Sequence, residues 1–326
     1  MKKVILTAVI ALAAALSVGA QHLAKSYRLR TVLPVEGRQG IAIDSNFYYV
    51  SDTRSLLKYD KQGNLLQRND QPFQHPEIAN HFGDIDVHDG EIYCGIEKFE
   101  YGRGYNIAVS IYDAATLQWK RDLPWRPESG QVEVSGIAVD RDRNMVWMSD
   151  WVDSRYAYCY DIPSGEYRTK IQLQPTPYWT QGLFVADSTL VFSCDDGEAA
   201  YGIPDNLYTA RIDSVPPTRL VEGVEVVKDT PFSVKLGGDG RPVMRRGLIA
   251  GGSQRGEVGH LRTMSDFRRA GEIEGLAIDP TNDELVVLNN RGTTIVLGMS
   301  QGPITEEGYT GEVHELYIYE PVYESK

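Results

Sequence analysis

Polar side chains recur within two residues of glycines that open short apolar runs. These positions are Gln39, His81, Asp84, Gln181 and Glu274. Carboxylate and amide oxygens suit a hard cation such as Ca²⁺ better than zinc, which prefers histidine and cysteine. Asp84, Gln181 and Glu274 are therefore a candidate set of metal ligands for calcium or another divalent ion. The alternative is that these polar groups only cap strands and bind water in a channel.

A second group of candidates lies around the ends of the next apolar runs. It contains Trp151, Trp179, Asn290 and Arg291. Aromatic side chains beside polar groups form platforms on which sugars or peptide chains stack. We therefore expect both groups to form one ligand-binding set, made of Gln39, His81, Asp84, Trp151, Trp179, Gln181, Glu274, Asn290 and Arg291. No complete catalytic constellation stands out, because Gly-x-Ser-x-Gly, His-Glu-x-x-His and Cys-x-x-Cys motifs are missing from the sequence.

Most of these residues lie in or beside a repeated sequence motif, and the strands of that repeat position them. The motif runs Gly-Ile-Ala-Ile-Asp at 40–44, and related copies begin at Gly83, Gly136, Gly182 and Gly275. In each copy a turn rich in Asp, Asn or Gly follows, and then further runs rich in Val, Ile and Tyr. Four short strands per repeat, joined by such turns, are typical of a propeller blade. The glycine has a physical reason, because blades converge on the axis and a side chain there would collide with its neighbours.

The sequence therefore predicts an all-β protein, a β-propeller of four-stranded blades. The interval from Gly182 to Gly275 is about twice the others, which leaves two possibilities for 225–272. We expect five blades with a long insertion there, and the alternative is six blades with a degenerate one. Strand-like stretches in this segment are 232–236, 242–250 and 260–264. The stretch 27–35 is expected to pair beside 316–319 and so close the ring.

The N-terminus and the overall composition indicate export. Lys2 and Lys3 precede an apolar run, and Val18 and Ala20 occupy the small-residue positions of a cleavage site before Gln21. Residues 1–20 therefore read as a signal peptide and 21–326 as a single propeller domain, secreted or periplasmic, without a membrane span in the mature chain.

A formal net charge of −12 argues against a nucleic-acid partner. The three cysteines, Cys94, Cys159 and Cys194, lie in apolar runs and are expected to be buried thiols rather than a disulfide framework.

A family resemblance supports the fold. The phrases at 81–90, Gln181-Gly182-Leu183 and Glu274-Gly275-Leu276-Ala277 resemble secreted bacterial β-propeller repeat proteins of unassigned function. More loosely, the chain is similar to NHL, YncE-like and gluconolactonase-type propellers. The gluconolactonase-type resemblance implies a divalent ion at the channel mouth, with Glu274 as the residue most like a ligand of theirs.

Two function classes follow. The first is an exported, non-catalytic propeller that binds a small polar molecule, a glycan or an envelope protein at the mouth of the central channel. The second is a divalent-metal-dependent hydrolase or lactonase, with Asp84, Gln181 and Glu274 as ligands and His81 as a base. A purely structural scaffold within an envelope complex is a third possibility.

Overall fold

The computed structural model describes 21–100, 103–197, 203–212, 218–224, 226–227, 230–234, 244–250, 253–267, 271–291, 294–295, 299–300 and 313–323. Side chains are described in these ranges except at 103, 218–255 and 291–300. The expected signal peptide, residues 1–20, and the side chain of Arg291 therefore lie outside the described part of the protein. Among the described residues, no helix has both the length and the apolar character that crossing a membrane requires.

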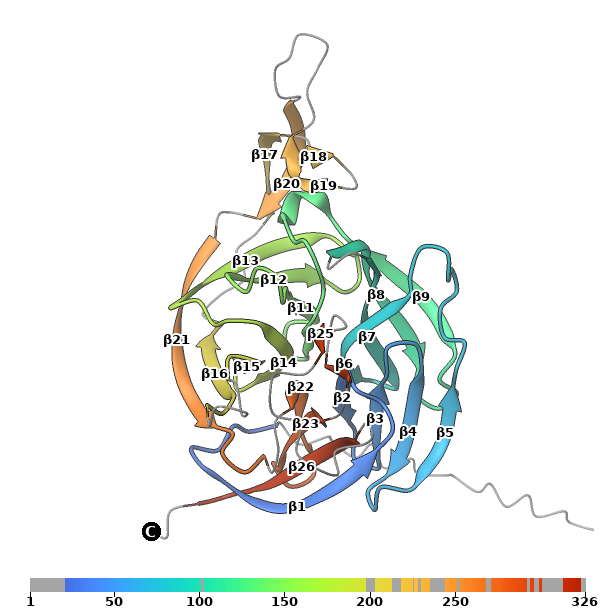
Figure 1. Ribbon diagram of the computed structural model, residues 1–326. Coiled ribbons are helices and arrows are strands. Elements are labelled where there is room, and N and C mark those ends of the chain that lie inside the picture. The colour runs from blue at the N-terminus through green and yellow to red at the C-terminus, as the bar shows by residue number, and fades with distance from the viewer. Residues whose placement is uncertain are drawn as a thin grey trace, which may run out of the picture.

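The described chain is built from strands arranged around a central axis (Figure 1). One four-stranded sheet contains β2 (Gly40–Ile43), β3 (Phe47–Ser51), β4 (Leu56–Asp60) and β5 (Leu65–Asn69). The next contains β6 (His81–His88), β7 (Glu91–Glu100), β8 (Arg103–Asp113) and β9 (Trp119–Pro124). A short 3₁₀ helix, η1 (Pro127–Ser129), follows β9.

An eight-stranded sheet comes next along the chain. Its strands, in spatial order, are β10 (Ile137–Asp140), β11 (Met145–Ser149), β12 (Tyr156–Asp161), β13 (Tyr167–Gln174), β21 (Ser253–Thr263), β16 (Asn206–Arg211), β15 (Thr189–Cys194) and β14 (Thr180–Ala186). Its neighbours pair antiparallel except β13 and β21, which pair in parallel. This one parallel pairing divides the sheet into two antiparallel groups of four strands.

The last four-stranded sheet joins the two ends of the described chain. It contains β22 (Glu272–Ile278), β23 (Leu285–Arg291), β26 (Val313–Pro321) and β1 (Tyr27–Val35). In the β1–β26 register, Leu29 lies opposite Tyr319 and Leu33 opposite Leu316. This is the pairing that the sequence predicts for 27–35 beside 316–319.

The inner strands approach so closely that only glycine fits where they begin. A Cβ added to Gly275 would lie 2.7 Å from the Cα of Gly40, and one added to Gly83 would lie 2.5 Å from the Ser135 carbonyl oxygen. Added Cβ atoms at Gly136 and Gly182 would meet neighbouring atoms just as closely. The physical reason given for the repeated glycine is therefore confirmed.

Serine hydroxyls link neighbouring sheets at the same level. Ser51 donates to the Gly83 carbonyl at 3.0 Å, Ser135 to the Thr180 carbonyl at 2.6 Å and Ser193 to the Glu274 carbonyl at 2.5 Å. Outside this level, apolar side chains of facing sheets form the core, in which Trp147, Phe82, Phe184 and Tyr317 are fully buried. The three cysteines are buried free thiols, as expected.

The segment 225–272 combines two kinds of structure. The hairpins of β17 (Thr218–Val224) with β20 (Met244–Ala250), and of β18 (Val226–Val227) with β19 (Thr230–Val234), lie outside the ring in Figure 1. Strand β21 instead returns to the ring and pairs with β16. A third small hairpin joins β24 (Thr294–Ile295) to β25 (Met299–Ser300).

Candidate functional site

The candidate side chains gather on one face of the ring. In each antiparallel pair, the start of the inner strand lies opposite the end of the second strand, as in Gly40 with Ser51, His81 with Glu97, and Glu272 with Asn290. Segments that are distant in sequence therefore present their ends on the same side. We call this side the mouth.

Asp84 forms the floor of the mouth. Its Oδ1 accepts the backbone N–H groups of Ile41 at 3.2 Å and Ile85 at 2.8 Å, and its Oδ2 accepts that of Leu183 at 3.0 Å. One fully buried carboxyl thus ties together strands of three sheets. Burial raises the pKa of Asp84 well above its usual value, although the three N–H groups act in the opposite direction.

A histidine and a buried glutamate pair above this floor. The Nδ1 of His81 lies 3.1 Å from the Oε1 of Glu97, whose Oε2 accepts the Val134 N–H at 3.2 Å. Burial raises the pKa of Glu97 to about 8 and lowers that of His81 to about 4. Desolvation penalises the charged form of each group, so the pair is neutral over most of the range near pH 7.

Glu133 lies beside this pair and connects it to an aromatic surface. Its Oε2 accepts the backbone N–H groups of Trp151 at 2.8 Å and Val152 at 2.9 Å. Burial, and secondarily the charge of Glu97, raise the pKa of Glu133 to about 8. The two carboxyls therefore interact electrostatically while each remains protonated near neutral pH.

A second carboxyl pair completes the mouth. Gln181 Nε2 donates to the Oε1 of Glu272 at 2.7 Å, and Asn290 Nδ2 donates to the Oε1 of Glu274 at 2.6 Å. Burial raises the pKa of Glu272 to about 7, and burial together with the neighbouring Glu272 raises that of Glu274 well above its usual value. We call Glu97, Glu133, Glu272 and Glu274 the carboxyl cluster.

Arg38 lies between the two halves of this cluster. Its Nη2 lies 3.8 Å from the Oε2 of Glu272, and its charge also lowers the pKa values of His81 and Glu274. Within the described part of the chain, Arg38 Nε, Glu272 Oε2 and Trp151 Nε1 are buried without a hydrogen-bond partner. Polar atoms left in this state are uncommon in folded proteins, so three of them at one site call for an explanation.

An aromatic pair borders the cluster. The rings of Trp151 and Trp179 stack with centroids 6.1 Å apart and an interplanar angle of 22°, and Tyr178 meets Trp179 edge-on. Trp179 is 48% exposed and Tyr178 is 68% exposed. Trp179 also has a positive φ of 50°, a conformation that is uncommon for a bulky residue. The hydrogen bond from the Trp151 backbone N–H to the Glu133 carboxyl places this apolar surface beside the carboxyls.

The structure thus brings most of the predicted ligand-binding set together. His81, Gln181, Glu274 and Asn290 take part in the hydrogen bonds above, and Trp151 and Trp179 stack. Gln39 is half-buried at the mouth, where its carbonyl accepts the Gly275 N–H at 3.2 Å.

Two of the expected metal ligands, Asp84 and Gln181, make hydrogen bonds within the protein. Asp84 directs both oxygens at backbone N–H groups, and Gln181 uses its amide nitrogen on Glu272. Within the ranges that the structure describes, no group of three or more His, Cys, Asp or Glu side chains has the arrangement of a metal site. The set of Asp84, Gln181 and Glu274 stays a prediction.

Four residues of the site are not in the predicted set, namely Arg38, Glu97, Glu133 and Glu272. The repeat places the last three near the mouth, because each lies close to a strand end that opens there. Their burial could not be predicted, because it depends on neighbours from other sheets. Val134 is an example, since it precedes β10 of the next sheet and donates its N–H to the Oε2 of Glu97 at 3.2 Å.

Comparisons with known proteins bear on the fold. No protein-family model matches the chain, and no curated protein is significantly similar to it in sequence. The crystal structure of Myxococcus xanthus glutaminyl cyclase is similar, with a TM-score of 0.50 and 8% identity over 90% of this chain and 96% of that one. This likeness supports a propeller-like all-β fold, without favouring NHL, YncE-like or gluconolactonase-type propellers.

Proposed function

We propose that this protein is an exported five-bladed propeller that binds a small polar ligand at the mouth. The blade count takes the eight-stranded sheet as two blades that meet at the β13–β21 pairing. The observation that carries the binding proposal is the carboxyl cluster, in which buried side chains from separate sheets lie beside a stacked tryptophan pair whose Trp179 is 48% exposed.

The chemistry of the cluster defines the ligand class. A protonated carboxyl both donates and accepts hydrogen bonds, so it suits hydroxyl, amide or amino groups better than it suits anions. The Trp151–Trp179 pair offers a flat apolar surface for a sugar ring or a peptide side chain. A small glycan or the free end of a peptide combines both features, and both occur outside the cytoplasm.

Trp179→Ala is expected to weaken ligand binding about tenfold, because a stacking contact at a partly desolvated site contributes on the order of 1 kcal/mol or more. The measurement is calorimetric titration with a panel of mono- and disaccharides and short unblocked peptides. Tyr323→Ala is the matched control, because Tyr323 is 69% exposed and lies near the C-terminus, away from the mouth. Equal losses in both variants, or no binding by any member of the panel, would refute the proposal.

A second candidate function is cyclisation of an N-terminal glutamine. It is favoured by the likeness to glutaminyl cyclase together with two buried carboxyls whose pKa values are about 8. In this reaction the α-amine nitrogen bonds to the side-chain carbonyl carbon, and the side-chain nitrogen leaves as ammonia. The step requires one of the two carboxyls in its ionised form, which takes the amine proton, and the other in its protonated form, which protonates the leaving nitrogen.

Glu133→Gln separates the two functions. If the protein is a cyclase, the variant should release ammonia from a Gln-initiated peptide at least about a hundredfold more slowly, the usual contribution of a general acid or base. If it only binds, neither protein releases ammonia and the peptide still titrates. The metal-dependent lactonase alternative is tested separately, by elemental analysis and by the shift of the thermal midpoint on adding Ca²⁺.

A further inference from the structure

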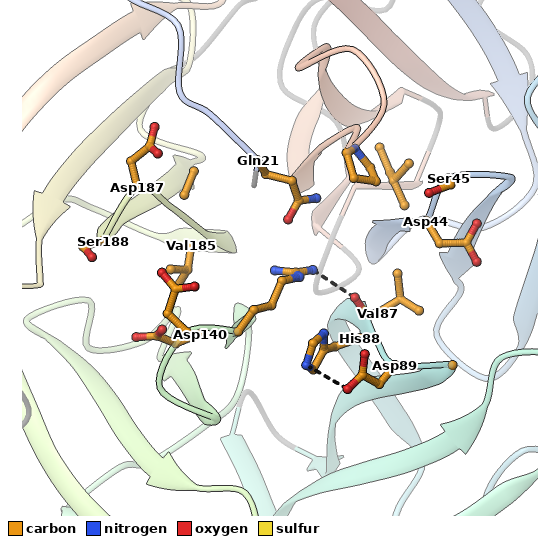
Figure 2. A pocket seen from close by; sticks show the side chains of 16 residues that line it. Gln21, Asp44, Ser45, Val87, His88, Asp89, Asp140, Val185, Asp187 and Ser188 are labelled. Atoms are coloured by element: carbon orange, nitrogen blue, oxygen red, sulfur yellow. Dashed lines mark hydrogen bonds and ion pairs between the residues drawn. The ribbon is translucent and has the colours of Figure 1, made fainter. Parts of the chain in front are cut away.

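A hollow lies at the other end of the axis, opposite the mouth. It has a volume of about 430 Å³ and is lined by turns that join the first and second strands of each sheet (Figure 2). These turns contribute Asp44–Ser45, His88–Gly90, Asp140–Asp142, Asp187–Ser188 and Pro280. We call this hollow the turn cavity. The turn cavity is separate from the mouth, because the inner strands close the axis between the two.

The residue that follows the predicted cleavage site enters this cavity. Gln21 is only 8% exposed, and its side chain points toward the middle of the space between the turns (Figure 2). Its Nε2 donates to the Ile278 carbonyl at 2.5 Å. Glutamine is mostly exposed in folded proteins, so this buried and hydrogen-bonded side chain indicates a docked segment.

Hydrogen bonds and apolar packing also hold the three residues after Gln21 in place. His22 donates its N–H to Asp283 Oδ1 and Leu23 donates its N–H to Asp187 Oδ2, both at 2.9 Å. The His22 ring lies 2.9 Å from the other oxygen of Asp187. Leu23 and Ala24 pack against the apolar core. Successive backbone groups are therefore satisfied by side chains from the β14–β15 and β22–β23 turns.

The charge of the cavity suits a cationic chain end. Its described lining includes five aspartates, Asp44, Asp89, Asp140, Asp142 and Asp187, against a single arginine. That arginine, Arg141, is paired with Asp86 at 2.7 Å. Asp140 is paired with Arg143 at 2.9 Å, which leaves the other four aspartates without an arginine partner in the described part of the chain. Cleavage after Ala20 would create an α-ammonium group on Gln21, next to this surplus of carboxylates.

We propose that the turn cavity is the docking site for the processed N-terminus of this chain. Gln21 to Ala24 form a strap across two turns, and the new α-ammonium is attracted to the aspartates. The proposal rests on cleavage after Ala20 and is independent of ligand binding at the mouth. Processing of the leader thus adds a charge that helps to hold the strap and link the two sheets.

The test uses the exported, full mature protein. Intact mass first identifies the starting residue, which must be Gln21. An amine-selective acylating reagent should then modify the α-amine about tenfold more slowly in the parent than in Asp187→Asn, because a docked strap must open before it reacts. The amide hydrogen of Leu23 should also exchange faster in that variant.

Two variants keep the test decisive. Glu77→Gln makes the same charge change at an exposed position outside the cavity, so its acylation rate should stay close to that of the parent. His22→Ala removes the ring contact with Asp187 from an exposed position and should also speed acylation if Asp187→Asn does not fold. A different starting residue, equal rates in parent and strap variants, or a product lighter by one ammonia would overturn the proposal. Cyclisation of Gln21 would remove the nitrogen that binds Ile278.

Discussion

Asp84→Ala is expected to lower the free energy of unfolding by about 3–9 kcal/mol, since three buried N–H groups lose their acceptor at about 1–3 kcal/mol each. These donors belong to Ile41, Ile85 and Leu183, which lie in strands of three different sheets. The loss should therefore weaken the centre of the ring rather than one sheet. The measurement is equilibrium unfolding in urea, followed by tryptophan fluorescence.

Asp84→Asn is the matched control. The amide keeps one oxygen that can accept the Ile41 and Ile85 N–H groups but presents an NH₂ group to Leu183. It should therefore destabilise the protein less than alanine does. Equal stability of the alanine variant and the parent would show that Asp84 does not hold the axis.

Raising the pH from about 5 to about 9 is expected to destabilise the folded protein strongly. Glu97 and Glu133 have ordinary pKa values of 4.5 and folded-state values of about 8. Between these limits the folded protein binds more protons than the unfolded chain, so its stability falls as the pH rises. Each group contributes a slope of at most about 1.4 kcal/mol per pH unit. The check is the urea midpoint measured across this range.

The double variant Glu97→Gln, Glu133→Gln should flatten this dependence, because neither amide titrates. Glu77→Gln is the control, since the Glu77 side chain is exposed and its variant should retain the slope of the parent. A parent protein whose stability is constant between pH 5 and 8 would contradict the assignment of neutral buried carboxyls.

The sequence predicts the fold features that repeat. Glycine at the start of each inner strand and the pairing of 27–35 with 316–319 both follow from local patterns. The close approach at Gly275 and the opposition of Leu33 and Leu316 agree with them. Local patterns succeed here because convergence on an axis imposes the same steric demand on every copy.

Much of the candidate site depends on contacts between copies, which no local pattern reveals. The metal role expected of Asp84 stays a prediction, while its oxygens accept N–H groups from strands that lie far apart in the sequence. The repeat places Glu97 at a strand end near the mouth, but its burial depends on Val134, which precedes the next sheet. The turn cavity was missed as well, because its aspartates read as ordinary hairpin turns and Gln21 reads only as the residue after a cleavage site.

The central claim is that carboxyls from separate sheets meet at the mouth and remain protonated near neutral pH. A ¹³C NMR titration of protein labelled at the glutamate side-chain carboxyl tests it most directly, with Gln variants to assign the signals. The account predicts that Glu97 and Glu133 titrate near pH 8 and that replacing either one shifts the other. If every glutamate titrated between about 4 and 5, as solvent-exposed carboxyls do, the proposed site would not exist.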